Sequence, residues 1–101
     1  MKMPIPKTIR IGKTTYLVHR PEKMRASAVR GHIKYSEKHI SVAKKCNVTG
    51  RRYTPHETAE TFWHEVTHGI LDDMGHPLAT SEKFVVAFSQ RLNGVIHSAK
   101  F

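Results

Sequence analysis

The sequence contains a single cysteine, Cys46, which excludes both an internal disulfide and a zinc site built from cysteines alone. It also lacks any run of about 18–20 apolar residues, the length that a membrane-spanning helix needs. The first residues lack the apolar core of a signal peptide, so we expect a cytoplasmic protein with no membrane partner. Its 39% hydrophobic and 25% charged residues are typical of a folded protein, and we predict a single domain over residues 1–101.

Acidic residues are scarce in the first half of the chain. Residues 1–53 hold 14 of the 17 lysines and arginines but only Glu22 and Glu37, a net charge of +12. Residues 54–101 hold three basic and six acidic residues, a net charge of −3. A strong positive charge suggests nucleic acid as a partner. The boundary between the two halves is also the point where the hydrophobic periodicity changes.

The basic half shows the alternation of polar and apolar residues that is typical of half-buried strands. A glycine-containing turn, Gly12-Lys13, joins the first two predicted strands into a hairpin. A second hairpin has its turn at residues 36–38. The four predicted strands are residues 7–11, 14–18, 32–35 and 39–42.

Residues 43–53 are polar and basic, and they predict a surface loop. Lys44, Lys45, Arg51 and Arg52 cluster in this loop. We consider two interpretations: a solvated basic loop, or a contact for nucleic acid or another acidic partner.

The second half is predicted to form two helices. Thr54, Pro55 and Glu57 form a capping box with proline at the first helical position, and Gly75 followed by Pro77 ends the helix. A second helix is expected to begin at residue 80 or 81. The predicted apolar face of the first helix is Ala59, Phe62, Trp63, Val66, Ile70 and Met74. The predicted apolar face of the second is Phe84, Val85, Phe88, Leu92, Val95 and Ile96.

The first predicted helix contains an H-E-x-x-H motif, His64-Glu65-Val66-Thr67-His68. Residues i and i+4 share one face of a helix, so both imidazoles can bind one zinc ion at about 2.0–2.1 Å. Glu65 projects beside them, where it can act as the general base that takes a proton from water. Both histidines lie about 125–165° from the centre of the apolar stripe. The alternative is therefore a pair of solvated histidines on an exposed helix face.

A catalytic zinc ion usually has three protein ligands and one open position. The metzincin pattern, which continues with a glycine at 71 and a histidine at 74, is excluded because the chain has Leu71 and Met74. Two candidates for the third ligand stay open. Glu82 begins the next helix, which can fold back over the first, and His76 directly follows the terminating glycine. Asp72 has two open interpretations: an acceptor for the ring N–H of His68, or a solvated acid near the C-terminus of the helix.

Residues 60–70, centred on the motif, resemble the small zincin-like metallopeptidases of the gluzincin type. The resemblance extends in particular to the minimal ImmA/IrrE-like and SprT-like domains that are common in phage and mobile-element genomes. Residues 81–88 resemble the glutamate-bearing helix of these proteins, and the resemblance as a whole covers about residues 31–97.

The resemblance implies an α+β fold in which a small twisted antiparallel sheet packs on an active-site helix and a C-terminal helix. It implies that His64 and His68 bind one Zn²⁺ and that Glu65 is the catalytic base. It also implies an edge strand that holds an extended peptide substrate, for which residues 40–42 are the candidate. SprT-like proteins associate with DNA, and by this resemblance the basic residues 1–53 would contact DNA.

These observations lead to two hypotheses about function. The first is a zinc-dependent metallopeptidase with Glu65 as the catalytic base and Glu82 as the preferred third metal ligand. The second is a non-catalytic zinc-containing protein that contacts nucleic acid or a host protein through its basic half.

Overall fold

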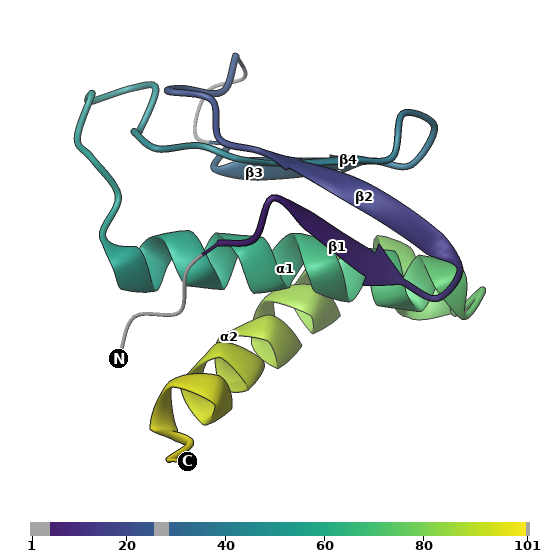
Figure 1. Ribbon diagram of the computed structural model, residues 1–101. Helices are drawn as coiled ribbons and strands as arrows, with labels where there is room; N and C mark the ends of the chain where they lie inside the picture. Colours follow the sequence, from purple (N-terminus) through teal and green to yellow (C-terminus); the bar gives the residue numbers. More distant parts are fainter. Residues whose placement is uncertain (1–4, 26–28, 101) are drawn as a thin grey trace.

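The computed structural model describes residues 5–25 and 29–100. Four strands precede two long helices, which a short 3₁₀ helix, η1, connects. The chain is layered, with α1 lying between the sheet and α2 (Figure 1). The elements are β1 (Thr8–Ile11), β2 (Thr14–His19), β3 (Gly31–Lys34), β4 (His39–Val42), α1 (Pro55–Asp73), η1 (Pro77–Thr80) and α2 (Glu82–Ser98). The predicted α+β class, the two hairpins and the two helices are confirmed.

The sheet is mixed, so the prediction of an antiparallel sheet is wrong in one pairing. β1 pairs with β2 and β3 pairs with β4 in antiparallel register, but β2 and β4 are parallel. The strand order is β1-β2-β4-β3. Short turns determine the pairing within each hairpin, whereas the long connection over residues 20–30 leaves the relative direction of the hairpins to tertiary packing.

The strand order also corrects the prediction of the edge strand. β4, which contains residues 40–42, lies inside the sheet, and the edge strands of the described sheet are β1 and β3. Ile40 and Val42 have no exposed surface because both point toward α1. β4 is internal because β2 pairs with it on the side opposite β3.

The sequence correctly predicts both ends of α1. Thr54 Oγ1 accepts a hydrogen bond from the backbone N–H of Glu57 at 3.1 Å, and the Glu57 carboxylate accepts one from the N–H of Thr54 at 2.9 Å. Pro55 is the first helical residue. At the other end Gly75 has a φ of +63°, the left-handed conformation that glycine adopts at helix ends.

The hydrophobic core lies between the sheet and α1. It consists of Ile11, Tyr16, Ile33, Ile40 and Val42 from the sheet, and Phe62 and Val66 from α1. The predicted apolar stripe of α1 is wrong at its end, where Ile70 and Met74 are 42% and 64% exposed. The buried face continues through Gly69 instead, because the Ile11 side chain packs where a side chain at residue 69 would stand.

α2 begins after Ser81, whose hydroxyl accepts a hydrogen bond from the N–H of Phe84, as an N-cap does. Its buried residues are Val85, Ser89 and Asn93. The prediction that Phe88 and Val95 are buried is wrong, since these side chains are 47% and 65% exposed. α2 packs against α1 and η1 alone among the described elements, so only a narrow strip of it is covered. No helix in the described part of the chain has the length and apolarity to cross a bilayer.

Candidate metal centre

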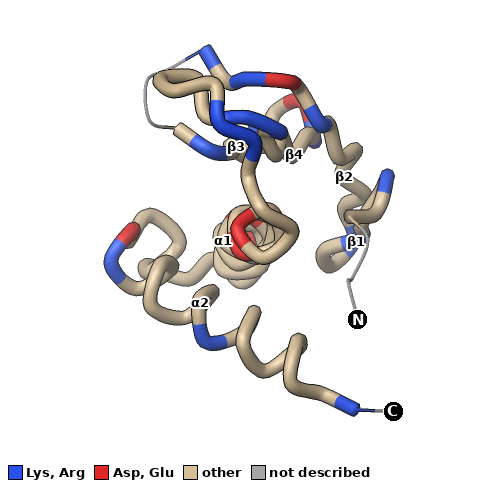
Figure 2. The backbone as a smooth tube through the Cα atoms, turned by 90° about the vertical axis from the view of Figure 1, so that its left-hand side faces the viewer, with Lys and Arg blue, Asp and Glu red and all other residues tan. Residues whose placement is uncertain are grey.

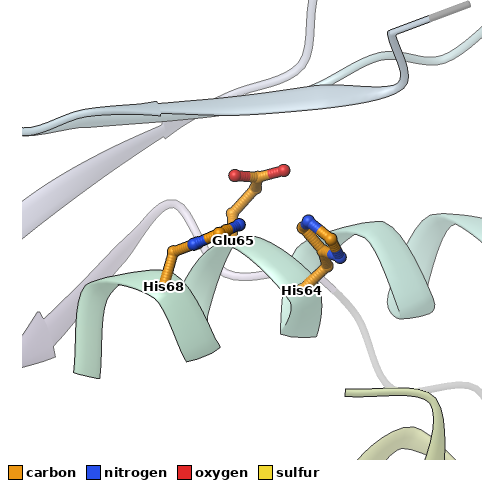
Figure 3. A group of neighbouring side chains, drawn as sticks. All are labelled: His64, Glu65 and His68. Carbon is orange, nitrogen blue, oxygen red and sulfur yellow. The ribbon is translucent and has the colours of Figure 1, made fainter. Parts of the chain in front are cut away.

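Three side chains that can bind a metal ion converge on two successive turns of α1. One ligating atom each from His64, Glu65 and His68 lies within 4.8 Å of the others. The two imidazoles flank Glu65, whose carboxylate points from α1 toward the sheet (Figure 3). Glu65 and His68 are buried, and the His64 side chain is 20% exposed. The alternative of two solvated histidines on an exposed helix face therefore does not fit this geometry.

Glu82 brings a carboxylate from α2 to both imidazoles. Its Oε1 lies 2.6 Å from Nε2 of His68, and its Oε2 lies 3.2 Å from Nε2 of His64. Two ligands of a tetrahedral zinc ion, each about 2.0–2.1 Å from the metal, are about 3.3 Å apart. The two nitrogens and the carboxylate therefore have the chemistry and the proximity of a zinc ligand set.

The backbone holds the imidazole of His68 in place. Its Nδ1 lies 2.7 Å from the carbonyl oxygen of Ala79 in η1. A carbonyl oxygen only accepts, so Nδ1 donates its proton and Nε2 keeps a lone pair in the neutral ring. That lone pair faces the carboxylate of Glu82, an arrangement that a cation between the two groups stabilises. Either a proton or a metal ion can be that cation. Two imidazoles and a carboxylate are the side chains that commonly bind zinc, so they fit a metal ion.

Asp72, the candidate acceptor for the His68 ring, is exposed on the surface of α1, and the carbonyl of Ala79 makes this bond instead. Sequence reasoning missed Ala79 because every residue carries a backbone carbonyl, and side-chain chemistry gives no signal for which one will be used.

Glu65 lies beneath β3, one of the two edge strands of the described sheet. Its side chain is close enough to β3 that a Cβ on Gly31 would stand 3.3 Å from Oε2. Burial, which His68 opposes and the carboxylate of Glu82 reinforces, raises the pKa of Glu65 from 4.5 to about 7. A carboxylate with a pKa near neutrality is suited to take up and release a proton at physiological pH.

Burial has the opposite effect on His64. Removal from water lowers the pKa of this imidazole, which the neighbouring carboxylate of Glu82 partly offsets. The neutral ring is thereby favoured, and the neutral ring is the form that binds a metal ion.

A cleft of about 290 Å³ opens over these residues, between the beginning of β3 and α1. Val29, Arg30 and Gly31 form one wall, and His64 and Glu65 lie on the other. The Arg30 guanidinium is fixed by a 2.7 Å hydrogen bond from Nη2 to the carbonyl of residue 57. The metal-binding atoms are therefore accessible from solvent beside a strand edge.

His76, the other candidate third ligand, has a different role in the structure. Its Nδ1 accepts a 3.0 Å hydrogen bond from the N–H of Leu78 and so caps η1. The structure brings Glu82, and not His76, to the two histidines.

The basic loop before α1 is largely paired with acidic residues. Lys44 and Lys45 lie 3.6 and 3.5 Å from the carboxylate of Glu22, and Arg51 lies 3.0 Å from that of Glu57. These ion pairs lower the net positive charge that the loop presents to a partner.

No protein-family model, curated protein or solved structure matches this chain. The likeness to zincin-like metallopeptidases therefore depends on the H-E-x-x-H motif and on the geometry that surrounds it.

Proposed function

We propose that the chain is a zinc-dependent metallopeptidase in which His64, His68 and Glu82 hold one Zn²⁺ and Glu65 is the general base. The convergence of two imidazole Nε2 atoms and a carboxylate from a second helix is the observation that carries this proposal. Two nitrogens and one oxygen form a typical ligand set for a catalytic zinc ion, and a fourth position then stays open.

The chemistry is divided between the ion and the chain. A bound zinc ion supplies Lewis acidity, which polarises a scissile carbonyl and makes a neighbouring water more acidic. Glu65 takes the proton from the attacking water and delivers it to the leaving amine. The burial of Glu65 keeps its carboxylate away from bulk water, and the contacts of His68 with Ala79 and Glu82 keep the imidazole in one orientation.

The edge strand supports a peptide as substrate. β3 pairs with β4 on one side and ends the described sheet on the other, and the cleft opens beside its first residue, Gly31. An extended peptide can add to such an edge through main-chain hydrogen bonds. Its backbone would then pass the metal-binding atoms and Glu65.

Zinc content and peptide hydrolysis test the proposal together. We expect the purified chain to hold one zinc ion by elemental analysis, and Glu65→Gln to keep the zinc and the thermal stability. Cleavage of a mixed peptide library, read by mass spectrometry, should fall about 100- to 10,000-fold in Glu65→Gln, since general base catalysis contributes about 10²–10⁴-fold.

His56→Gln is the matched control, because His56 lies on α1 with an exposed side chain outside the site. It should cleave like the unmodified chain. A chain that binds no zinc would overturn the metal site. A zinc-loaded chain whose Glu65→Gln variant cleaves at an unchanged rate would overturn the catalytic role alone.

A further inference from the structure

The outer face of the sheet, which points away from α1, carries an unusual set of side chains. Alternate residues of the strands, such as Ile33, Ile40 and Val42, point inward to the core. The register aligns the remaining residues in two rows across three strands. One row is Leu17, His39 and Lys34, and the other is His19, Ser41 and His32. Three histidines and a lysine therefore lie on a small area of one sheet face.

The residues that follow β2 turn this face into a pocket of about 850 Å³. Pro21, Met24 and Val29 give it an apolar wall, and the three histidines of the sheet line it. The rings of His19 and His39 are in edge-to-face contact, with their centroids 4.3 Å apart. The pocket thus offers flat rings and apolar surface beside its charged groups.

The positive charge of this pocket is less neutralised than that of the loop before α1. Among the described residues, Lys23 and Arg25 make no ion pair. Glu37 is the one acidic residue in the described lining, and Lys34 already binds it at 2.9 Å. Lysines and arginines gather on the sheet and its connections, whereas α1 carries none (Figure 2).

Arg20 adds a cation that is already partly removed from water. Its Nε donates to the carbonyl of Val42 at 2.9 Å, which fixes the guanidinium at the pocket. Burial lowers its pKa, and no carboxylate of the described residues pairs with it. A partly desolvated cation without an anionic partner is stabilised when an anion binds beside it.

We propose that this pocket is a binding site for single-stranded nucleic acid, in which Arg20, Lys23 and Arg25 contact phosphates and the histidine rings stack on bases. The combination of flat rings with lysine and arginine is the one that single strands require, because each nucleotide presents a base face and a phosphate. A hollow in a sheet suits an unpaired strand, whereas duplex DNA is read by a helix or ribbon that enters its groove. The site is separate from the candidate metal centre, which lies on the other side of the sheet.

Binding of a fluorescein-labelled oligonucleotide of about 12 nucleotides, followed by fluorescence anisotropy, tests the proposal. The pocket variant is Lys23→Glu/Arg25→Glu. Its control is Lys7→Glu/Lys13→Glu, which makes the same change of charge at two exposed residues beside β1. We expect the pocket variant to lose about tenfold or more in affinity at low salt, and the control to lose less than about threefold.

The unmodified chain should also prefer the single strand to a duplex of the same sequence and to vesicles of anionic lipid. An equal loss in both variants would overturn the site, since it would show nonspecific attraction to the charged half. Tighter binding of the duplex or the vesicles, or no binding at all, would overturn the choice of ligand.

A spectroscopic measurement keeps the test independent of variant folding. In the unmodified chain, the imidazole signals of His19, His32 and His39 should shift as the unlabelled oligonucleotide is added, and those of His56 and His97 should not. The same shifts should occur in Glu65→Gln, because this binding does not depend on catalysis. Shifts confined to histidines outside the pocket would overturn the proposal.

Discussion

The Nδ1–H of His68 donates to the carbonyl oxygen of Ala79 across 2.7 Å, and this bond connects α1 to the turn that leads into α2. It orients the imidazole so that Nε2 faces Glu82 at 2.6 Å. The geometry of the candidate metal centre therefore depends on a backbone group 11 residues beyond the H-E-x-x-H motif.

The tautomer of His68 is the first prediction. We expect the zinc-loaded chain at pH 8 to show His68 with its proton on Nδ1, because Ala79 offers only an acceptor. Long-range ¹⁵N–¹H correlation spectra distinguish the two ring nitrogens. The exposed imidazole of His56 provides a comparison. A proton on Nε2 of His68 would contradict both the bond to Ala79 and the role of this nitrogen as a ligand.

The third ligand gives the second prediction. Glu82→Ala should weaken zinc binding more than about 100-fold, because loss of a ligand should exceed the 10–100-fold effect of losing a group that only orients one. His76→Ala should weaken it less than about threefold and cost about 1 kcal/mol of stability through the lost cap of η1. Competition with a chromophoric chelator measures the affinities. The reverse order of the two variants would assign the ligand to His76.

The capping box of α1 gives a pH dependence. The Arg51 guanidinium, together with the backbone N–H of Thr54, lowers the pKa of Glu57 from 4.5 to about 2. The folded state therefore favours the carboxylate, and this contribution to stability is present above about pH 4.5 and is lost as the pH falls toward 2. Glu57→Gln should lower the melting temperature at pH 7 and show a smaller further decrease between pH 5 and pH 2.

Arg51→Gln should show part of the same loss, since it removes the main partner of Glu57. Thermal melts monitored by circular dichroism at several pH values provide the measurement. Parallel profiles for Glu57→Gln and the unmodified chain would show that this carboxylate does not contribute.

Two glycines should respond in opposite directions to the same substitution. A Cβ on Gly31 would stand 2.6 Å from Cγ2 of Thr61 and 2.8 Å from the carbonyl of Ser41. Gly31→Ala must therefore displace β3 from α1, at a cost of about 1–3 kcal/mol. A Cβ on Gly94, inside α2, would meet no atom within 4 Å. Gly94→Ala should stabilise the chain by about 0.5–1 kcal/mol.

Urea unfolding curves compare the two glycine variants. Peptide hydrolysis should fall in Gly31→Ala, because the displaced strand lies directly over Glu65. An equal effect of both substitutions would show that the close approach of β3 to α1 does not constrain residue 31.

Features that depend on neighbouring residues could be predicted from the sequence. Thr54 and Glu57 are three residues apart and cap one helix end, and His64 and His68 share a helix face by spacing alone. For the third metal ligand the sequence left Glu82 and His76 as alternatives. The position of Glu82 next to the two histidines depends on how α2 folds back over α1. Geometry over such a distance is decided by packing, and spacing along the chain only limits it.

The remaining features could not be predicted because they arise between distant segments. The parallel pairing of β2 with β4 joins two hairpins across a long connection. The expected edge strand was wrong for this reason, and so was part of the apolar face of α1, where Gly69 replaces Ile70 at the sheet. The row of His19, Ser41 and His32 likewise exists only after three strands have aligned.

The contact between α1 and α2 determines which helix separates first from the rest of the molecule. Val85 is the one buried apolar side chain of α2, and both amide atoms of Asn93 are buried without a partner among the described residues. Amide hydrogens of α2 should therefore exchange with solvent through a smaller opening than those of α1. An ion held by both helices would slow that exchange, because it binds only the closed state. A free ion concentration of 1,000 times the dissociation constant would raise the free energy of opening by about 4 kcal/mol. The exchange rate of α2 thus becomes a direct measure of metal affinity.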